Sequence, residues 1–124
     1  MYWQMSPPMN ENFKKGDIVL APLSYSDLVN NKLRPSLVLY HDTDVMQLTV
    51  AYISNKVPAK HGQFDIVILL GTATSTTAGL VYSSVVKVYW TAMIKRILVN
   101  RKIGEADNDL REKVNLILPS ALAI

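Results

Sequence analysis

The stretch LRPSLVL at residues 33–39 places an arginine and a proline directly before an apolar run. Pro35 lacks a backbone N–H, which a β-strand tolerates at its first position, so residues 36–40 are predicted to form a strand that begins at the proline. Arg34 is then held between a polar connection and a stiff strand. A guanidinium fixed in this way can donate paired hydrogen bonds to a phosphate. The residues alone leave open that Arg34 is a solvated side chain at a strand edge.

Four further runs on either side of this stretch have the composition of strands, at residues 16–21, 47–53, 65–70 and 80–89. Five short strands separated by turn-rich gaps favour a small antiparallel barrel or curled sheet. Residues 22–33 form a polar connection of twelve residues, a length typical of binding loops and lids.

The last part of the chain has a different pattern, which predicts a helix. Asp107 or Asn108 can cap its N-terminus, and Pro119 is expected to end or kink it. A shorter helical turn is predicted around residues 91–98. The apolar positions of the C-terminal helix recur at helical spacing and are expected to face the core: Leu110, Val114 and Ile117.

The composition limits the class of protein. A chain of 124 residues with 49% hydrophobic residues predicts one globular domain, which we expect over residues 14–124 after a flexible leader at 1–13. The absence of cysteine removes disulfides, thiolate zinc sites and cysteine nucleophiles, and fits a reducing cytoplasm. The apolar runs are too short to span a membrane.

Charge is unevenly distributed along the chain. Residues 14–102 hold 11 Lys and Arg against five acidic residues, a net +6, whereas residues 103–124 hold two against four, a net −2. A basic body with an acidic tail indicates a polyanionic partner for the body.

Common catalytic motifs are missing from the sequence. It contains no phosphate-cradling glycine loop, no metal-binding histidine pair and no Ser-His-Asp order. His41 and His61 could supply an acid and a base for phosphodiester cleavage, but a strand end and a turn are positions that favour solvated side chains over catalytic ones. We expect neither a metal site nor a cofactor.

The order of several short blocks resembles MazF/PemK-type toxins, the toxin halves of type II toxin–antitoxin systems. The resemblance covers roughly residues 14–118, and the arginine–proline step after a long loop is its most specific part. The blocks are Lys15–Leu20, Leu33–Leu39, Val50–Ser54, Ala78–Leu80, Ser84–Val88 and Arg101–Gly104.

The resemblance implies a mainly β protein of the α+β class, a small SH3-like antiparallel barrel with a C-terminal helix. It also implies a cytoplasmic homodimer that is neutralised by a cognate antitoxin. The implied activity is metal-independent, sequence-selective cleavage of single-stranded RNA, in which the ribose 2′-OH attacks the adjacent phosphorus. The family's catalytic arginine and threonine fall on Arg34 and Ser54.

Other residues are expected to contact the RNA: Tyr25, Lys32, Pro35, Lys56 and Lys87. Some family members carry a basic residue and an acid two positions apart on the last long strand, where this chain has Lys87 and Tyr89. Because a tyrosine offers no carboxylate, the proton-transfer roles have no assigned residue. The remaining strand aromatics are expected to line the barrel wall or a dimer contact: Tyr40, Tyr52, Tyr82 and Trp90.

Two alternative functions remain open at this level. The same barrel could poison a protein target, as gyrase-directed relatives of the fold do. It could also bind RNA or antitoxin without cutting, which the replacement of threonine by Ser54 and of the acid by Tyr89 would allow.

Overall fold

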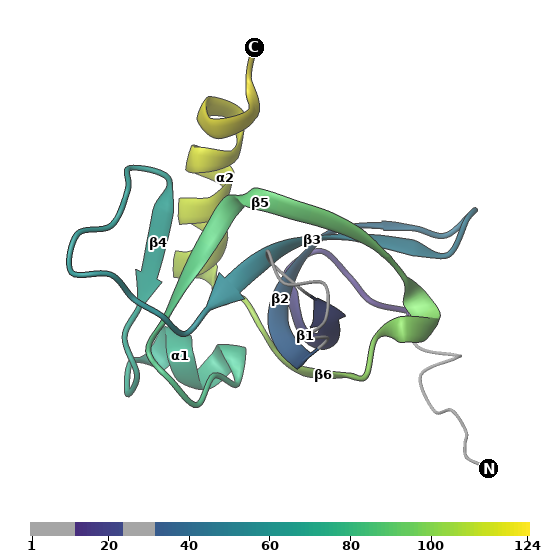
Figure 1. Cartoon of the computed structure of the whole chain (residues 1–124), viewed down its shortest axis with the longest axis horizontal. Helices are drawn as coiled ribbons and strands as arrows, with labels where there is room; N and C mark the ends of the chain where they lie inside the picture. The colour runs from purple at the N-terminus through teal and green to yellow at the C-terminus, as the bar shows by residue number, and fades with distance from the viewer. Residues whose placement is uncertain (1–11, 24–31) are drawn as a thin grey trace.

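The computed structural model describes residues 12–23 and 32–124. Strands dominate this part of the chain, with one short helix in the middle and a longer one at the end (Figure 1). The elements in chain order are β1 Asp17–Leu23, β2 Lys32–Asp42, β3 Gln47–Ser54, β4 Asp65–Ile68, α1 Ala73–Ala78, β5 Ser84–Lys95, the 3₁₀ turn Arg96–Leu98, β6 Arg101–Glu105 and α2 Asn108–Leu122.

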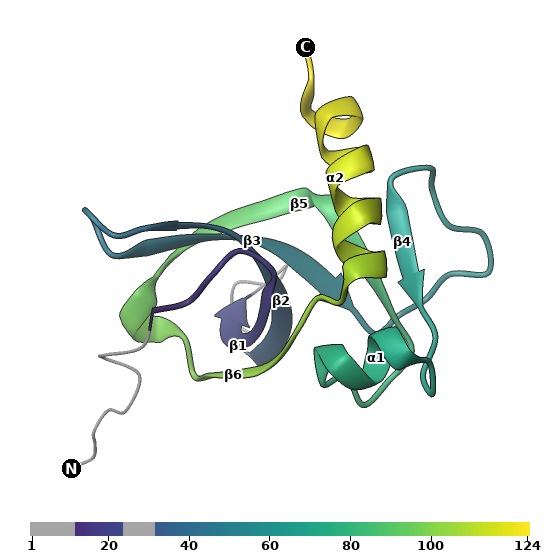
Figure 2. The same cartoon turned by 180° about the vertical axis from the view of Figure 1, so that it is seen from behind.

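The six strands form one sheet in the order β4-β5-β3-β2-β1-β6, and every neighbouring pair is antiparallel. The sheet curls so that β1, β2 and β6 turn back toward β3 and β5, which gives a half-barrel (Figure 1). Helix α2 lies against the outer side of this half-barrel near β4 and β5, as the view from behind shows (Figure 2). This confirms the predicted class, a curled antiparallel sheet with a C-terminal helix.

Irregular pairing explains the curl. The register shifts between Val38 and Tyr40 where β2 pairs β3, and again where Ala51 and Tyr52 pair Thr91 and Lys87 of β5. The second shift leaves three residues of β5, 88–90, outside the regular ladder. Extra residues in one strand bend it and increase its twist, so these bulges let a short sheet close on itself.

Alternation along the strands produces two cores, one on each face of the sheet. On β2, Leu37 packs into the cluster that α2 covers, together with Leu110 and Val114 of the helix. The next residue, Val38, packs into the cluster inside the half-barrel, which also contains Phe13 from the end of the expected leader. Successive strand side chains point to opposite faces, so a single β2 strand contributes to both cores.

Two glycines let α1 approach the edge strand β6 closely. Gly79 ends α1 with a positive φ of 73°, and a Cβ on it would collide with the Ile103 carbonyl. A Cβ on Gly104 would collide with the backbone of Ala78. This contact fixes the start of the segment between α1 and β5, residues 79–83, which borders the cavity described below.

The helix α1 was not foreseen by the strand pattern. Its sequence, ATSTTA, has weak helix propensity, but the Thr72 hydroxyl accepts a hydrogen bond from the Ser75 N–H and caps the first turn. At the other end, the Gly79 N–H bonds back into the helix. Caps at both ends therefore outweigh the poor propensity of the residues between them.

Other boundaries also differ from the prediction. The expected helical turn at 91–98 is wrong, because β5 runs to Lys95 and only Arg96–Leu98 form a 3₁₀ turn. Residues 101–105 form the edge strand β6. Helix α2 continues past Pro119, and its last turn closes through the Ala123 N–H on the Pro119 carbonyl. The Asp107 cap and the buried Leu110 and Val114 are confirmed.

The polar connection predicted at 22–33 is shorter than expected, because β1 extends to Leu23 and β2 begins at Lys32. The prediction that this strand begins at Pro35 is therefore wrong, since pairing with β1 already starts at Lys32. Its remainder, residues 24–31, lies outside the described residues. Within the described ranges, neither α-helix is long and apolar enough to cross a membrane.

Candidate active site

Pro35 marks the point at which β2 loses one of its two neighbours. The strand pairs with β1 from Lys32 onward, but its ladder with β3 begins only at Ser36, opposite Tyr52. Pro35 has no N–H with which to extend that ladder. The start of β2 and the end of β3 therefore separate, and the space between them is open to side chains.

A cavity of about 550 Å³ lies at this separation. The start of β2, the end of β3, the segment 79–84 and the edge strand β6 border it. Its size is within the range typical of small-molecule sites, roughly 300–1,000 Å³. Apolar side chains make up part of the lining: Leu20, Leu33, Pro35, Ile53, Leu80, Val81 and Ile103.

Four cationic residues from three parts of the chain line the same cavity. They are Lys32, Arg34, Lys56 and Arg101. Among the residues that line it, all within the described ranges, none is acidic. Three ion pairs elsewhere in the described residues hold Lys87, Lys102 and Lys113. The cavity therefore has a positive potential that favours an anionic ligand.

Arg34 is anchored at one end of its guanidinium. Its Nε–H donates a hydrogen bond of 3.1 Å to the carbonyl of Leu23 at the end of β1, and its side chain is half-buried. The backbone is fixed by the β1 ladder, in which Arg34 lies opposite Ala21. Because both the backbone of Arg34 and its Nε are held in place, the guanidinium is oriented before any ligand binds.

Ser54 lies on the same face of the sheet as Arg34. Arg34 comes two residues before Ser36 and Ser54 two residues after Tyr52, so continuing the register would set them opposite each other. The Ser54 hydroxyl accepts a hydrogen bond of 3.1 Å from the Lys56 N–H, which orients its oxygen. Ser54 itself does not line the cavity, although Ile53, Asn55 and Lys56 do.

A second polar cluster lies on this face, one row further along the sheet. Lys87 is opposite Tyr52 on one side and Asp65 on the other. The Lys87 ammonium donates to Asp65 Oδ2 at 3.1 Å, and the Tyr89 hydroxyl donates to Asp65 Oδ1 at 3.2 Å. The Gly62 N–H also donates to Oδ2, at 2.9 Å. We call Asp65, Lys87 and Tyr89 the β5 cluster.

Burial and pairing act in opposite directions on the two charges of the β5 cluster. The side chains of Asp65 and Lys87 are only 2% and 16% exposed. Burial alone would raise the pKa of Asp65, but the Gly62 N–H and the Lys87 ammonium outweigh it and lower the pKa. Burial alone would lower the pKa of Lys87, but Asp65 outweighs it and raises the pKa. Both groups therefore stay charged at neutral pH.

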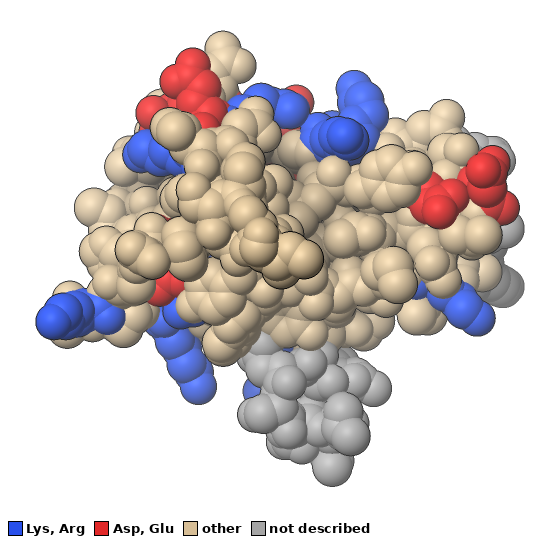
Figure 3. Space-filling model, turned by 90° about the horizontal axis from the view of Figure 1, so that it is seen from above, with Lys and Arg blue, Asp and Glu red and all other residues tan. Residues whose placement is uncertain are grey.

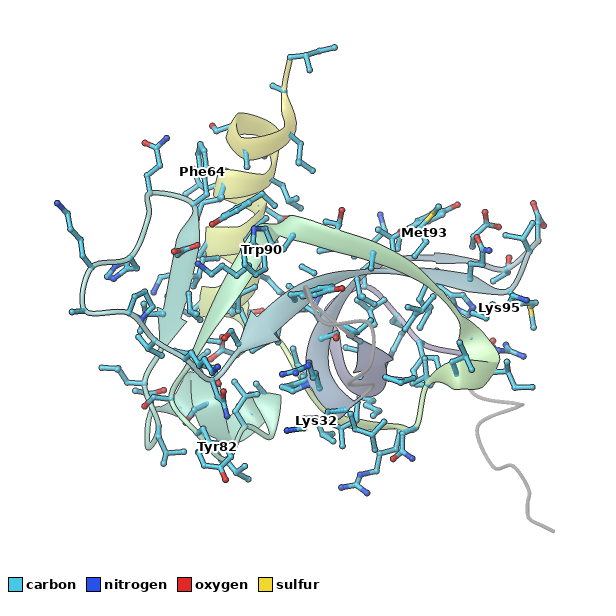
Figure 4. The ribbon with its side chains drawn as sticks, in the orientation of Figure 1. Lys32, Phe64, Tyr82, Trp90, Met93 and Lys95 are labelled. Carbon is cyan, nitrogen blue, oxygen red and sulfur yellow. The ribbon has the colours of Figure 1, made fainter. Side chains whose placement is uncertain are left out.

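Aromatic rings surround the Lys87 ammonium. It lies 5.3 Å from the centre of the Trp90 ring and 5.9 Å from that of Tyr89. The Trp90 ring also meets Tyr52 edge-on, with the ring centres 6.3 Å apart. Met93 projects from β5 on the side away from the barrel interior (Figure 4). The face seen from above is largely uncharged, with lysine, arginine and acidic side chains toward its margins (Figure 3).

The predicted site residues fall into separate groups in the structure. The cavity brings together Lys32, Arg34, Pro35 and Lys56. Lys87 belongs to the β5 cluster, and Tyr25 lies outside the described residues. His41 and His61 do not line the cavity; His41 Nδ1 lies 2.9 Å from the Phe13 carbonyl, and His61 is exposed.

Three residues of these sites were missed by sequence reasoning. Arg101 belongs to a block of the resemblance to which no role was assigned, and it lines the cavity. Tyr82, expected in the barrel wall or a dimer contact, is 61% exposed and also lines the cavity. Asp65 carried no functional signal, because its position opposite Lys87 depends on how β4 pairs with β5 across a connection that contains α1.

Metal ligands do not cluster in the described chain. Over residues 12–23 and 32–124, no three His, Asp or Glu side chains group closely enough to hold a metal ion.

The fold is similar to those of solved MazF toxins and of a mycobacterial endoribonuclease. A toxin MazF-mt6 of Mycobacterium tuberculosis has a TM-score of 0.66 and 22% sequence identity, over 87% of this chain and 97% of that one. A mycobacterial endoribonuclease solved with its cognate antitoxin has a TM-score of 0.65 and 12% identity, over 89% and 94%. MazF of the MazE-MazF complex from Deinococcus radiodurans gives 0.63 and 19%, over 88% and 93%.

Comparison at the level of sequence agrees with the fold. No curated protein matches the chain. The family model described as PemK-like, MazF-like toxin of type II toxin–antitoxin systems matches residues 14–122, nearly the whole length. The arginine–proline step near the start of β2, the half-barrel and the C-terminal helix all lie within this match, and the chain belongs to the PemK-like, MazF-like family of type II toxins.

Proposed function

We propose that this toxin cleaves single-stranded RNA at the cavity around Arg34, without a metal ion. The observation that carries the proposal is the convergence of four cations on one cavity whose described lining contains no acid. An RNA strand is a polyanion, and its phosphates are the ligands that such a site favours. Membership of the toxin family and the endoribonucleases among the structures of similar fold support the same activity.

In the proposed reaction the ribose 2′-hydroxyl gives its proton to water as its oxygen bonds to the neighbouring phosphorus. The P–O5′ bond breaks and the leaving oxygen takes a proton from water, which gives a 2′,3′-cyclic phosphate and a 5′-hydroxyl end. Negative charge grows on the phosphate oxygens in the transition state. Arg34 donates hydrogen bonds to these oxygens, and the Ser54 hydroxyl donates one from the opposite strand. Donors aimed at developing charge typically each contribute about 10²–10³ in rate.

Contacts away from the reacting phosphate hold the strand. Lys32 and Lys56 bind neighbouring phosphates. Pro35 keeps β2 and β3 apart so that the RNA can enter between them. Lys87 and Tyr25 were expected to add RNA contacts, and we retain them as weaker candidates. For Lys87, any contact would compete with its ion pair to Asp65.

We propose that the protein acts in the cytoplasm as a homodimer that a cognate antitoxin neutralises. A mycobacterial relative of the same fold was solved with its antitoxin, which supports this part of the proposal. An antitoxin with an acidic segment would complement the cationic cavity and compete with RNA for it.

The test uses the purified full chain with single-stranded RNA in EDTA. We expect cleavage that persists in chelator, is abolished in Arg34→Ala and is retained in the control variant Lys95→Ala, an exposed lysine at the far end of β5 (Figure 4). Circular dichroism and thermal melts confirm that both variants fold. A strict requirement for a divalent ion would overturn the mechanism.

A second candidate function is binding of RNA without cleavage. The exclusion of Ser54 from the cavity lining and the absence of a carboxylate at Tyr89 favour it. Salt-sensitive RNA binding with no cleavage products would identify this function in the same experiment.

A further inference from the structure

Among the described residues that line the cavity, Tyr82 is the one with an aromatic side chain, and that side chain is largely exposed. It is 61% exposed although Leu80, two residues earlier, is buried. The side chain projects from the segment between α1 and β5, at the edge of the molecule where Lys32 also projects (Figure 4), and both residues line the cavity.

Local hydrogen bonds hold the backbone on which Tyr82 is mounted. The Ser84 hydroxyl donates to the Tyr82 carbonyl at 2.9 Å. The next residue, Ser83, accepts a hydrogen bond of 2.8 Å from the Leu70 N–H. At its start the segment is fixed by the close contact of Gly79 with β6. An exposed ring on a fixed backbone loses little freedom when a ligand stacks on it.

The lining of the cavity combines two chemistries that occur together in a nucleotide. Leu80 and Pro35 supply apolar surface, and Arg34, Lys32 and Arg101 supply positive charge. A nucleobase presents a flat apolar face, and its phosphate presents the negative charge. Bases of unpaired RNA can be turned out of the strand and stacked on aromatic rings, which paired bases cannot do.

We propose that Tyr82 is the stacking platform for one unpaired base of the RNA, next to the phosphate that Arg34 contacts. This inference rests on the proposed function in taking RNA as the ligand and Arg34 as a contact of its phosphate. It makes Tyr82 a residue that determines affinity and the choice of cleavage site, without a part in the bond-breaking step. Alanine substitution of a stacking residue weakens binding by about 5- to 150-fold per base.

The experiment measures binding of the full chain to a short, fluorescein-labelled, single-stranded 2′-O-methyl RNA of mixed sequence. This probe lacks the attacking hydroxyl, so it binds without being cleaved. We expect Tyr82→Ala and Tyr82→Leu to weaken binding about 5- to 150-fold and Tyr82→Phe to match the unsubstituted chain within about twofold. The slope of log K against log salt should not change, because no phosphate contact is lost.

The matched control is Tyr40→Ala. Tyr40 is 51% exposed on β2 but does not line the cavity, so its removal should leave binding unchanged. Equal losses in Tyr40→Ala and Tyr82→Ala would overturn the proposal. So would full binding by Tyr82→Leu, which would mean that the contact is apolar rather than aromatic, or a change in self-association on Tyr82→Ala with RNA binding intact.

The outcome separates this inference from the proposed function. Tight probe binding that depends on Tyr82, with no cleavage of ordinary RNA, would support the platform and contradict the nuclease. Cleavage of ordinary RNA with probe binding insensitive to Tyr82 would do the reverse. A chain that neither binds the probe nor cleaves ordinary RNA would overturn both.

Discussion

The cavity and the β5 cluster both present cations on the sheet, but they differ in what surrounds the charge. Lys87 is half-buried, and its ammonium is bound by the carboxylate of Asp65 at 3.1 Å. Lys32, Lys56 and Arg101 line a cavity whose described residues include no acid. A charge that the fold already neutralises contributes to stability, whereas a charge left without a carboxylate is available to a ligand.

This difference changes the interpretation of the strand positions that distinguish family members. From the sequence, Lys87 and Tyr89 are a basic residue and a missing acid. In the structure a carboxylate is present at that place, supplied by Asp65 of the neighbouring strand and bonded to both residues. With a lowered pKa and three hydrogen-bond donors, Asp65 is a poor proton acceptor, so the β5 cluster is better suited to holding side chains than to moving protons.

The largest expected effect separates the two regions by activity. Arg34→Gln should reduce RNA cleavage by about 10²–10³-fold in kcat, because a donor to the developing phosphate charge is lost. Lys87→Gln should change kcat per folded molecule by only a few fold. Single-turnover cleavage at saturating RNA, with the folded fraction measured in parallel, tests both.

An Arg34→Lys variant sharpens the result. It keeps the charge but loses the planar fork, so we expect it to recover RNA binding more than it recovers kcat. If Lys87→Gln impaired kcat as strongly as Arg34→Gln, the distinction between the two regions would be wrong.

The second expected effect separates the regions by stability. Lys87→Met leaves the buried Asp65 carboxylate without its ion partner, which should lower the free energy of unfolding by about 3 kcal/mol. Lys56→Met, at an exposed residue of the cavity rim, should change it by less than about 0.5 kcal/mol. Urea unfolding followed by circular dichroism measures both.

The double variant Asp65→Asn with Lys87→Met provides the control. It removes both charges, so it should be more stable than Lys87→Met alone. Equal stability of the single and double variants would show that the two charges do not depend on each other.

The arginine–proline step illustrates how much of the site could be predicted from sequence. Arg34 and Pro35 are adjacent and their chemistry is local, so an arginine held by its backbone beside a polar connection was predictable. The strand start was not, because β2 begins at Lys32 rather than at the proline. The phosphate contact stays a prediction. The Pro35 break also explains the cavity, but its other walls come from β6 and from the segment after α1. Arg101 and Tyr82 reach it only through tertiary packing, including the glycine contact of α1 with β6.

In the fold, too, elements with a strong local sequence pattern were predictable, and elements that depend on capping or on a neighbouring strand were not. Runs of β-branched residues identified β1 to β5, and the Asp107 cap with its apolar stripe identified α2. Residues 73–78 were missed because capping, not propensity, makes them helical. Residues 101–105 contain two basic residues and a glycine, and they form a strand because β1 offers them an edge to pair with.

The third expected effect concerns salt. Replacing Lys32, Lys56 or Arg101 singly by Gln should weaken RNA binding at all sequences alike and reduce the slope of log K against log salt by about 0.7 each. Lys102→Gln should leave the slope unchanged, since that ammonium is paired with the carboxylate of Asp17 at 3.2 Å. Binding titrations of the 2′-O-methyl probe at several salt concentrations measure the slopes. A similar change of slope in Lys102→Gln would show that ion pairing does not decide which cations meet the RNA.

The smallest expected effect is the dependence of stability on pH. The lowered pKa of Asp65 means that its contribution is present above its unfolded pKa, near 3.9, and is lost as pH falls through the folded value. The raised pKa of Lys87 means that its contribution is present below about pH 10.4 and is lost as pH rises through the folded value. Between about pH 5 and 9 the β5 cluster should therefore leave stability flat. Urea unfolding of the original chain and of the double variant Asp65→Asn with Lys87→Met, from pH 3 to 11, measures these two contributions. The difference in the free energy of unfolding between the two proteins should shrink at both extremes of pH and stay constant between them. A difference that varied near pH 7 would mean that one of the two groups titrates there and is not held charged by its partner.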